Sequence, residues 1–363
     1  MLGNVKGAAV LLAASLCACS GGASAIPTQQ VGAFSGVRTT ASPQLYAFSS
    51  LSTASASTTS VASYPLDATG ETTPSSSLSG GKTRLQQGHG IAFGNNGRLY
   101  VLSGSPGQPL HLLEFGAGER GNARPIVDYR FPSQLLADYT EGLSFDRAGH
   151  LWVVDAAGRK VRAFAISGRH LQTVAAFAPE LHTTDGWKPA GPHGMFVDSS
   201  DHLYCWLVYL KNGIGEIGVT EYDVSHPRQP RILRSFLDPR FPDVPPDSTA
   251  MDARGYLYAA DSVPEYGVRV YPPTWKSLQP PVRIVGAYKP RSRYVLGSVA
   301  SLTVRADGTL YVATAGVHGS FSPSIVVYPP HTNGNPQPAA TITNAQFLQY
   351  ADGEDYGNLL AIK

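Results

Sequence analysis

One template recurs five times along the chain and limits the folds that the chain can adopt. Each copy has a short apolar strand, a polar turn and a second strand that opens with Leu and an aromatic residue. The turn residues are 52, 52, 54 and 53 positions apart; they are Gly97, Gly149, Asp201, Gly255 and Gly308. Because regular periods of this length are typical of repeat architectures, we predict that one supersecondary unit is repeated along the chain.

Each unit is predicted to contain four antiparallel strands. The turn residues suit short hairpins that need a positive φ, which Gly adopts freely and Asp tolerates. Two further strand-like segments follow each hairpin, for example 161–165 and 171–175 in the second unit. No stretch has convincing helical periodicity. Four antiparallel strands per unit are typical of a β-propeller blade, so the sequence predicts an all-β propeller over residues 45–363.

The two ends of the chain are predicted to complete the ring. Residues 349–363 are expected to supply inner strands, with Gly357 to Leu360 matching the template hairpin. Segments that begin at Leu45, Ser60 and Thr73 resemble the outer part of a blade. Joining them gives a sixth blade and removes free sheet edges. Since Leu45–Phe48 also matches the second-strand template, a seven-bladed ring stays open as an alternative.

The first residues are typical of an export signal. Lys6 precedes an apolar run over 8–16, which is long enough for a signal peptide and too short to span a bilayer. The segment Leu16-Cys17-Ala18-Cys19 resembles the cleavage box of bacterial lipoproteins. The resemblance implies a signal peptide over 1–18, lipidation of Cys19 and a lipid-anchored protein in the cell envelope. Ser20 resembles outer-membrane sorting in Gram-negative bacteria.

Residues 19–44 are rich in Ser, Ala, Thr and Gly and are predicted to be a flexible linker. The alternative for the leader is an ordinary secretory signal that is cut near Ala23 or Ala25. Charge excludes one class of partner, because a net charge of +2 and no run of clustered Lys and Arg argue against nucleic acid. Only Cys205 lies in the predicted propeller, so a disulfide within the folded part of a monomer is excluded and we expect a buried thiol.

The repeats resemble those of NHL-repeat propellers. The segments that carry the resemblance are Gly194-Met-Phe-Val-Asp198, Leu257-Tyr-Ala-Ala-Asp261 and Leu151-Trp-Val-Val-Asp155. The resemblance covers about 45–363 and implies the fold much more than any activity, because propellers host many functions. Asp155 and Asp261 are expected to cap the turn that follows the second strand.

A candidate site emerges at the position eight residues before each turn residue. Innermost propeller strands begin at the mouth of the central channel, and we call the ring of these positions the channel rim. Its residues are His89, Glu141, His193, Asp247, Ala300 and Gln349. Two histidines and two carboxylates from four consecutive blades have the chemistry to bind a divalent cation, either Zn²⁺ or Ca²⁺. The alternative is a solvent-facing polar rim whose side chains accept hydrogen bonds from strand-start amides.

Short matches to enzyme families support a second hypothesis. Glu141-Gly142-Leu143 and Pro246-Asp247 resemble metal-site segments of gluconolactonases, although the Asn positions of that family hold histidine here. Pro192-His193-Gly194 resembles the zinc-binding segments of peptidyl-hydroxyglycine amidating lyases, and virginiamycin B lyase is a channel-mouth enzyme of similar repeat type. These resemblances imply a metal-dependent lactonase or lyase. The leading hypothesis is a monomeric binding or scaffold module whose loops and rim hold a protein or small-molecule ligand.

We predict that Cys19→Ser abolishes lipidation, because the thiol of Cys19 is the acceptor that the cleavage box implies. Incorporation of labelled palmitate into the expressed protein measures it. The matched control is Cys17→Ser, which is expected to keep full incorporation. Label that persists in Cys19→Ser would refute the lipoprotein interpretation.

Overall fold

The computed structural model describes most of the predicted propeller. The described residues are 42–52, 57–105, 107–116, 118–132, 135, 142–180, 188–211, 214–238, 246, 248–260, 267–287, 295–314, 323–344 and 359–363. Every regular element among them is a β-strand. In this part of the chain, no helix is long and apolar enough to cross a membrane.

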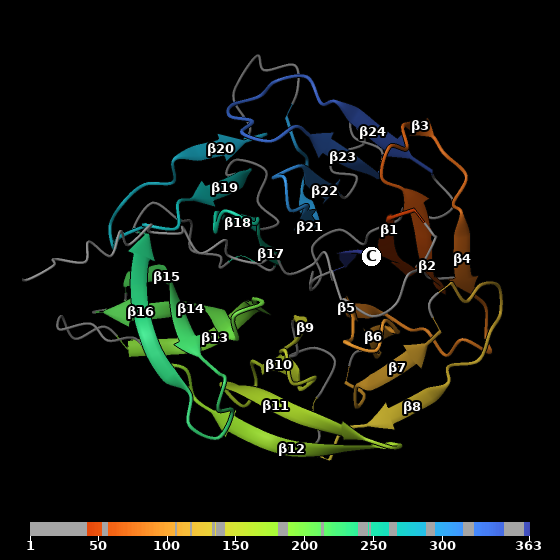
Figure 1. Cartoon of the computed structure of the whole chain (residues 1–363), viewed down its shortest axis with the longest axis horizontal. Coiled ribbons are helices and arrows are strands. Elements are labelled where there is room, and N and C mark those ends of the chain that lie inside the picture. Colours follow the sequence, from red (N-terminus) through yellow and green to blue (C-terminus); the bar gives the residue numbers. More distant parts are fainter. Residues whose placement is uncertain are drawn as a thin grey trace, which may run out of the picture.

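Six antiparallel sheets of four strands stand around a common axis (Figure 1). Blade 1 contains β5 (Gly88–Phe93), β6 (Leu99–Ser103), β7 (His111–Phe115) and β8 (Val127–Arg130). Blade 2 contains β9 (Leu143–Phe145), β10 (Leu151–Asp155), β11 (Lys160–Ser167) and β12 (His170–Phe177). Blade 3 contains β13 (Lys188–Val197), β14 (His202–Lys211), β15 (Ile214–Asp223) and β16 (Arg231–Asp238).

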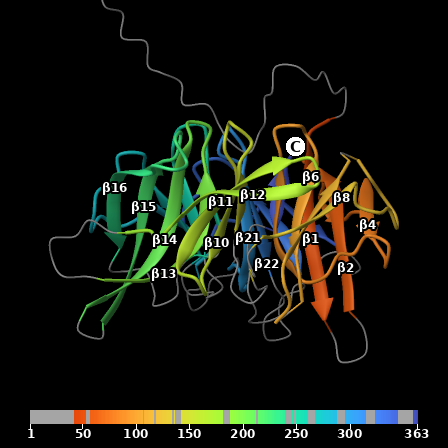
Figure 2. The ribbon, with the colours of Figure 1, turned by 90° about the horizontal axis from the view of Figure 1, so that it is seen from below.

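The remaining blades complete the circle. Blade 4 contains β17 (Ser248–Met251), β18 (Leu257–Ala260), β19 (Val268–Tyr271) and β20 (Arg283–Val285). Blade 5 contains β21 (Val299–Val304), β22 (Leu310–Thr314), β23 (Ser324–Tyr328) and β24 (Ala340–Thr343). Blade 6 contains β25 (Leu360–Ile362), β1 (Gln44–Ser52), β2 (Ser57–Pro65) and β4 (Ser76–Ser79), while β3 (Gly70–Glu71) extends the sheet of blade 5. Seen from the side, β1 and β2 run across the thickness of the ring (Figure 2).

Blade 6 is built from both ends of the chain and settles the number of blades at six. β25 is its innermost strand and pairs antiparallel with β1, with Leu45 opposite Ile362 and Ala47 opposite Leu360. The backbone of Gln44 exchanges hydrogen bonds of 3.0 and 2.9 Å with that of Lys363. The sequence prediction of a ring closed by both termini is confirmed, and the seven-bladed alternative is wrong.

One detail of the predicted closure is also wrong. The C-terminal segment supplies the innermost strand alone, and β1 takes the second-strand position that the sequence assigned twice. Ile362 faces Leu45 as Phe93 faces Leu99, so Ile362 takes the place of Phe93 in the innermost strand, whereas Gln349 lies outside the described residues. The template match at Gly357 misled because a short apolar run fits an innermost and a second strand equally well.

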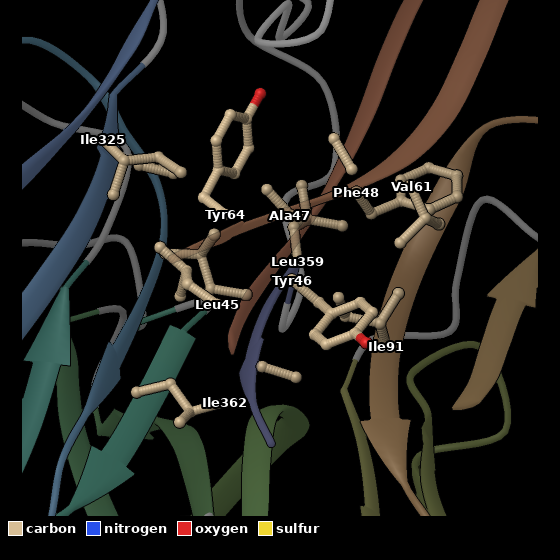
Figure 3. Packing of buried hydrophobic residues seen from close by; sticks show 14 of the residues in the cluster. Leu45, Tyr46, Ala47, Phe48, Val61, Tyr64, Ile91, Ile325, Leu359 and Ile362 are labelled. Carbon is tan, nitrogen blue, oxygen red and sulfur yellow. The ribbon is translucent and has the colours of Figure 1, made fainter. Parts of the chain in front are cut away.

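An apolar cluster seals the closure. Leu359, Leu360 and Ile362 are buried together with Ile91 of blade 1 and Ile325 of blade 5 (Figure 3). The ends of the chain are therefore held by packing against both neighbouring blades as well as by the strand pairing.

The hairpins between first and second strands have the predicted turn chemistry. All five turn residues have positive φ, including the non-glycine Asp201 at 61°. An aspartate at the start of three of these hairpins caps the turn: Asp146 Oδ1 accepts a hydrogen bond from His150 N, and Asp198 and Asp252 accept equivalent bonds. Asp155 Oδ1 accepts a 2.8 Å bond from Gly158 N, which confirms its predicted capping role, whereas Asp261 lies outside the described residues.

Serines join innermost strands of neighbouring blades. Ser248 Oγ of blade 4 accepts a 2.9 Å hydrogen bond from Leu302 N of blade 5. Ser301 Oγ of blade 5 accepts bonds of 2.9 and 3.2 Å from Leu359 N and Leu360 N of blade 6. The innermost edge of a blade has no further strand to pair with, so these hydroxyls satisfy backbone amides that would otherwise stay unpaired in a buried place.

We predict that deletion of residues 359–363 destroys cooperative unfolding or lowers the melting temperature steeply. The deletion removes β25 and three buried aliphatic side chains, each contributing about 1.5–3 kcal/mol, which in sum approaches the whole stability of a typical domain. Thermal melts followed by circular dichroism measure the effect. Lys363→Ala is the control, because it removes the 3.1 Å bond from Lys363 Nζ to Gly97 O and the contact of Nζ with the Phe93 ring but leaves β25 in place. An unchanged melt of the truncated protein would contradict the closure.

Candidate functional site

The innermost strands stand side by side in chain order around the axis. Contacts join β5 to β9, β9 to β13, β13 to β17, β17 to β21, β21 to β25, and β25 back to β5. The blades that carry the four predicted rim ligands are thus consecutive. A Cβ on Gly90 would lie 2.9 Å from Leu143 Cβ of the next blade. This crowding explains the glycine at the first template position of blade 1, and at the same position of blade 2 a Cβ on Gly142 would lie 3.3 Å from Met195.

The channel-rim position is a β-bulge in three of the six blades. In blade 1, Gly88 faces Ser103 and Gly90 faces Leu102, so His89 is the extra residue. In blade 5, Ala300 is the extra residue in the same way. In blade 3, Pro192 faces Leu207 and Met195 faces Cys205, which leaves His193 and Gly194 opposite one residue. The equal spacing predicted from the turn residues is confirmed at these three positions.

A bulge takes a residue out of the ladder and turns its side chain in a new direction. His89 is buried at 2% exposure, His193 is half-buried, and Ala300 is fully buried. Because alanine occupies this bulge in blade 5, the bulge itself does not require an ionisable side chain.

The two predicted carboxylates, Glu141 and Asp247, lie outside the described residues. The four-residue ligand set therefore stays a prediction. Within the described ranges, no group of three or more His, Cys, Asp or Glu residues is placed to hold a metal ion.

Cys205 lies in β14 and is fully buried. Burial raises the pKa of its thiol well above the ordinary value, because an apolar environment disfavours the thiolate. The prediction of a buried structural cysteine is confirmed.

A charged network in blade 3 was missed by sequence reasoning. His202 Nδ1 lies 3.2 Å from Glu221 Oε1 and 3.5 Å from Asp198 Oδ2. Arg234 Nε donates to Glu221 Oε2, and the Arg234 guanidinium lies over the Phe236 ring. Glu221 faces both Tyr204 and Arg234 across the ladder, so strand register alone brings these groups together and no sequence motif announces them.

The network shifts the pKa of its members. The hydrogen bond to Glu221 raises the pKa of His202 in spite of partial burial. Burial opposes ionisation of Glu221, but the bonds from His202 and Arg234 outweigh it and lower its pKa. Burial raises the pKa of Asp198. The charges of the network pair with one another, and Arg234 Nη1 also donates a 2.8 Å hydrogen bond to Pro273 O of blade 4. We therefore assign the network to the stability of blade 3 and its contact with blade 4 rather than to a site.

We predict that His202→Gln lowers the free energy of unfolding more at about pH 5.5 than at about pH 8.5. A raised folded-state pKa means that protonated His202 stabilises the fold fully below its unfolded pKa and loses that contribution as pH rises through the folded value. Because the pKa of Glu221 is lowered, its own contribution to stability is lost only at acid pH, below the two values compared here. Urea unfolding at both pH values measures the difference.

His170→Gln is the control for this pH dependence, because His170 is an exposed histidine at the start of β12. A difference between wild type and His202→Gln that does not change with pH would contradict the assignment.

Comparisons with known proteins agree with the architecture. No protein-family model and no curated protein matches the chain. A candidate 6-phosphogluconolactonase from Bacteroides fragilis superposes with a TM-score of 0.50 at 11% identity, covering 86% of this chain and 87% of its own. A candidate 6-phosphogluconolactonase from Bacteroides uniformis gives 0.47 at 12% identity, covering 83% and 82%. Virginiamycin B lyase from Staphylococcus aureus gives 0.42 at 12% identity, covering 79% and 85%. At these identities the likeness concerns the fold, and the chain shares the β-propeller architecture of such proteins.

Proposed function

We propose that this protein is an exported, lipid-anchored β-propeller that binds its ligand at the channel rim. The observation that carries the proposal is the occupancy of the rim bulge. Blades 1 and 3 hold His89 and His193 at a position where blade 5 holds Ala300. Since the fold accepts alanine there, we infer that the imidazoles on two blades serve to bind a ligand.

A divalent cation is the ligand that best fits the rim chemistry. In the sequence, Glu141 lies between His89 and His193, and Asp247 follows them. Glu141 and Asp247 each precede the turn residue of their repeat by eight positions, as the two histidines do. Two imidazoles and two carboxylates form a mixed nitrogen and oxygen set. Zn²⁺ accepts such a set, whereas Ca²⁺ takes oxygen ligands, so we favour Zn²⁺. The proposal of a lipid anchor is based on the leader sequence and on Cys19.

A metal-dependent lactonase or lyase is the second candidate. The observation that favours it is the presence of imidazoles in the rim bulges of blades 1 and 3, because histidine nitrogens are ligands of catalytic zinc sites. A zinc ion with an open position acts as a Lewis acid towards a carbonyl group and lowers the pKa of bound water. Among the similar structures are ones described as lactonase and lyase, and these names supply substrates for a test.

We predict that the metal-free protein without its leader binds one Zn²⁺ per chain and that His193→Ala weakens this affinity by roughly tenfold or more. The affinity should fall as pH drops through histidine protonation, because the ligand must be neutral. Calorimetric titration with ZnCl₂ at several pH values measures both effects. His193 is the first choice because it is only half-buried; His89→Ala follows as a second variant, with thermal melts to check folding.

His226→Ala is the matched control, since His226 is exposed in the loop between β15 and β16. The proposal fails if wild type binds no Zn²⁺ or if both rim variants bind it like wild type. Hydrolysis of glucono-δ-lactone separates the two candidates. Turnover that needs Zn²⁺ and His193 identifies an enzyme, and Zn²⁺ binding without turnover favours the binding module.

A further inference from the structure

A basic groove lies on the outer flank of the propeller, away from the innermost strands that form the channel rim. Its larger cavity has a volume of about 500 Å³, and an adjoining one of about 440 Å³ shares Gly81, Arg84 and Asp128 with it. Four cations line the larger cavity, and Asp128 is its one carboxylate; the cations are Lys82, Arg84, Arg124 and Arg169. Asp128 belongs to β8, the outermost strand of blade 1 (Figure 1).

Three blades contribute to the groove. Lys82 and Arg84 lie in the connection from blade 6 to blade 1, Arg124 precedes β8, and Arg169 lies in the β11–β12 turn of blade 2. Their segments are tied to one another. Lys82 N donates a 2.7 Å hydrogen bond to Asn122 Oδ1, and the buried Thr83 hydroxyl donates a 2.6 Å bond to Gly80 O. The backbone that carries the cations is therefore fixed before any ligand arrives.

The charges in the groove do not cancel. Asp128 Oδ2 pairs with Arg84 Nη1, and Asp128 Oδ1 lies 2.8 Å from His111 Nδ1. Asp128 is thus already engaged on both oxygens. Lys82, Arg124 and Arg169 are exposed, and they form no ion pair with any residue in the described part of the chain. Three cations remain for an external anion.

Arg84 pairs with the carboxylate of the groove from an uncommon backbone conformation. Its φ is 61°, in the left-handed region that favours Gly, Asn and Asp. From this position the Arg84 side chain reaches Asp128. Its guanidinium covers Asp128, which would otherwise repel an anion in the groove.

We propose that this groove binds a small soluble ligand that carries two or more phosphate or carboxylate groups. The volume lies within the range of pockets for small molecules. Arginine and lysine side chains bind phosphate and carboxylate oxygens through charge-assisted hydrogen bonds. Ile126 is 41% exposed beside Arg124 and offers an apolar contact to the body of such a ligand. The inference stands apart from the proposed function, because the groove and the channel rim share no residue.

Calorimetric titration of the metal-free protein with inorganic pyrophosphate tests the proposal. Wild type is expected to bind, and added NaCl is expected to weaken the binding by screening. The triple variant Lys82→Gln, Arg124→Gln and Arg169→Gln is expected to bind at least about tenfold more weakly. The control is Arg228→Gln with Lys276→Gln, two exposed cations on blades 3 and 4, which should bind like wild type.

Three results would overturn the proposal. One is the absence of pyrophosphate binding to wild type, and another is a triple variant that binds pyrophosphate like wild type. The third is sedimentation with phosphatidylglycerol vesicles without any binding of pyrophosphate, since that would identify a lipid headgroup. Because His193→Ala should leave pyrophosphate binding unchanged, failure here is distinguishable from failure of the rim proposal.

Discussion

The pairing of β25 with β1 is the interaction on which the rest of the ring depends. Both partners come from the ends of the chain, and the pair completes a sheet that the five internal repeats cannot supply. Leu360 and Ile362 then pack with Ile91 and Ile325 of the two neighbouring blades. A propeller without this sheet would expose the flanks of blades 1 and 5, and exposed edges invite association with other chains.

Closure also imposes a constraint at the axis. Six innermost strands meet there, and each has one edge without a ladder partner. Two kinds of residue relieve the crowding and pair the amides. Glycine at the first template position lets the blades approach, as Gly90 does against Leu143. Serine at the same position in blades 4 and 5 accepts hydrogen bonds from the next blade through Ser248 and Ser301.

The same geometry allows different side chains at the channel rim. The bulge takes one residue out of the ladder, so cross-strand pairing does not fix which side chain stands there. Histidine in blades 1 and 3 and alanine in blade 5 occupy equivalent bulges. Different side chains are also allowed in the flank groove, because it lies on loops and an outermost strand rather than at the packed axis.

The sequence by itself determined whatever depends on neighbours along the chain. Turn spacing, the positive φ at Asp201 and the capping role of Asp155 were all predictable, because hairpins and their caps are local. Equal offsets from the turns also predicted that residues 89, 193 and 300 hold equivalent register positions, since repeats share one register. Other features were decided only by the tertiary structure. These are the single C-terminal strand, the network of His202 with Glu221, and the groove in which Lys82 meets Arg169. In each case the residues meet through cross-strand register or the packing of different blades, and such contacts leave no periodic signal in the sequence.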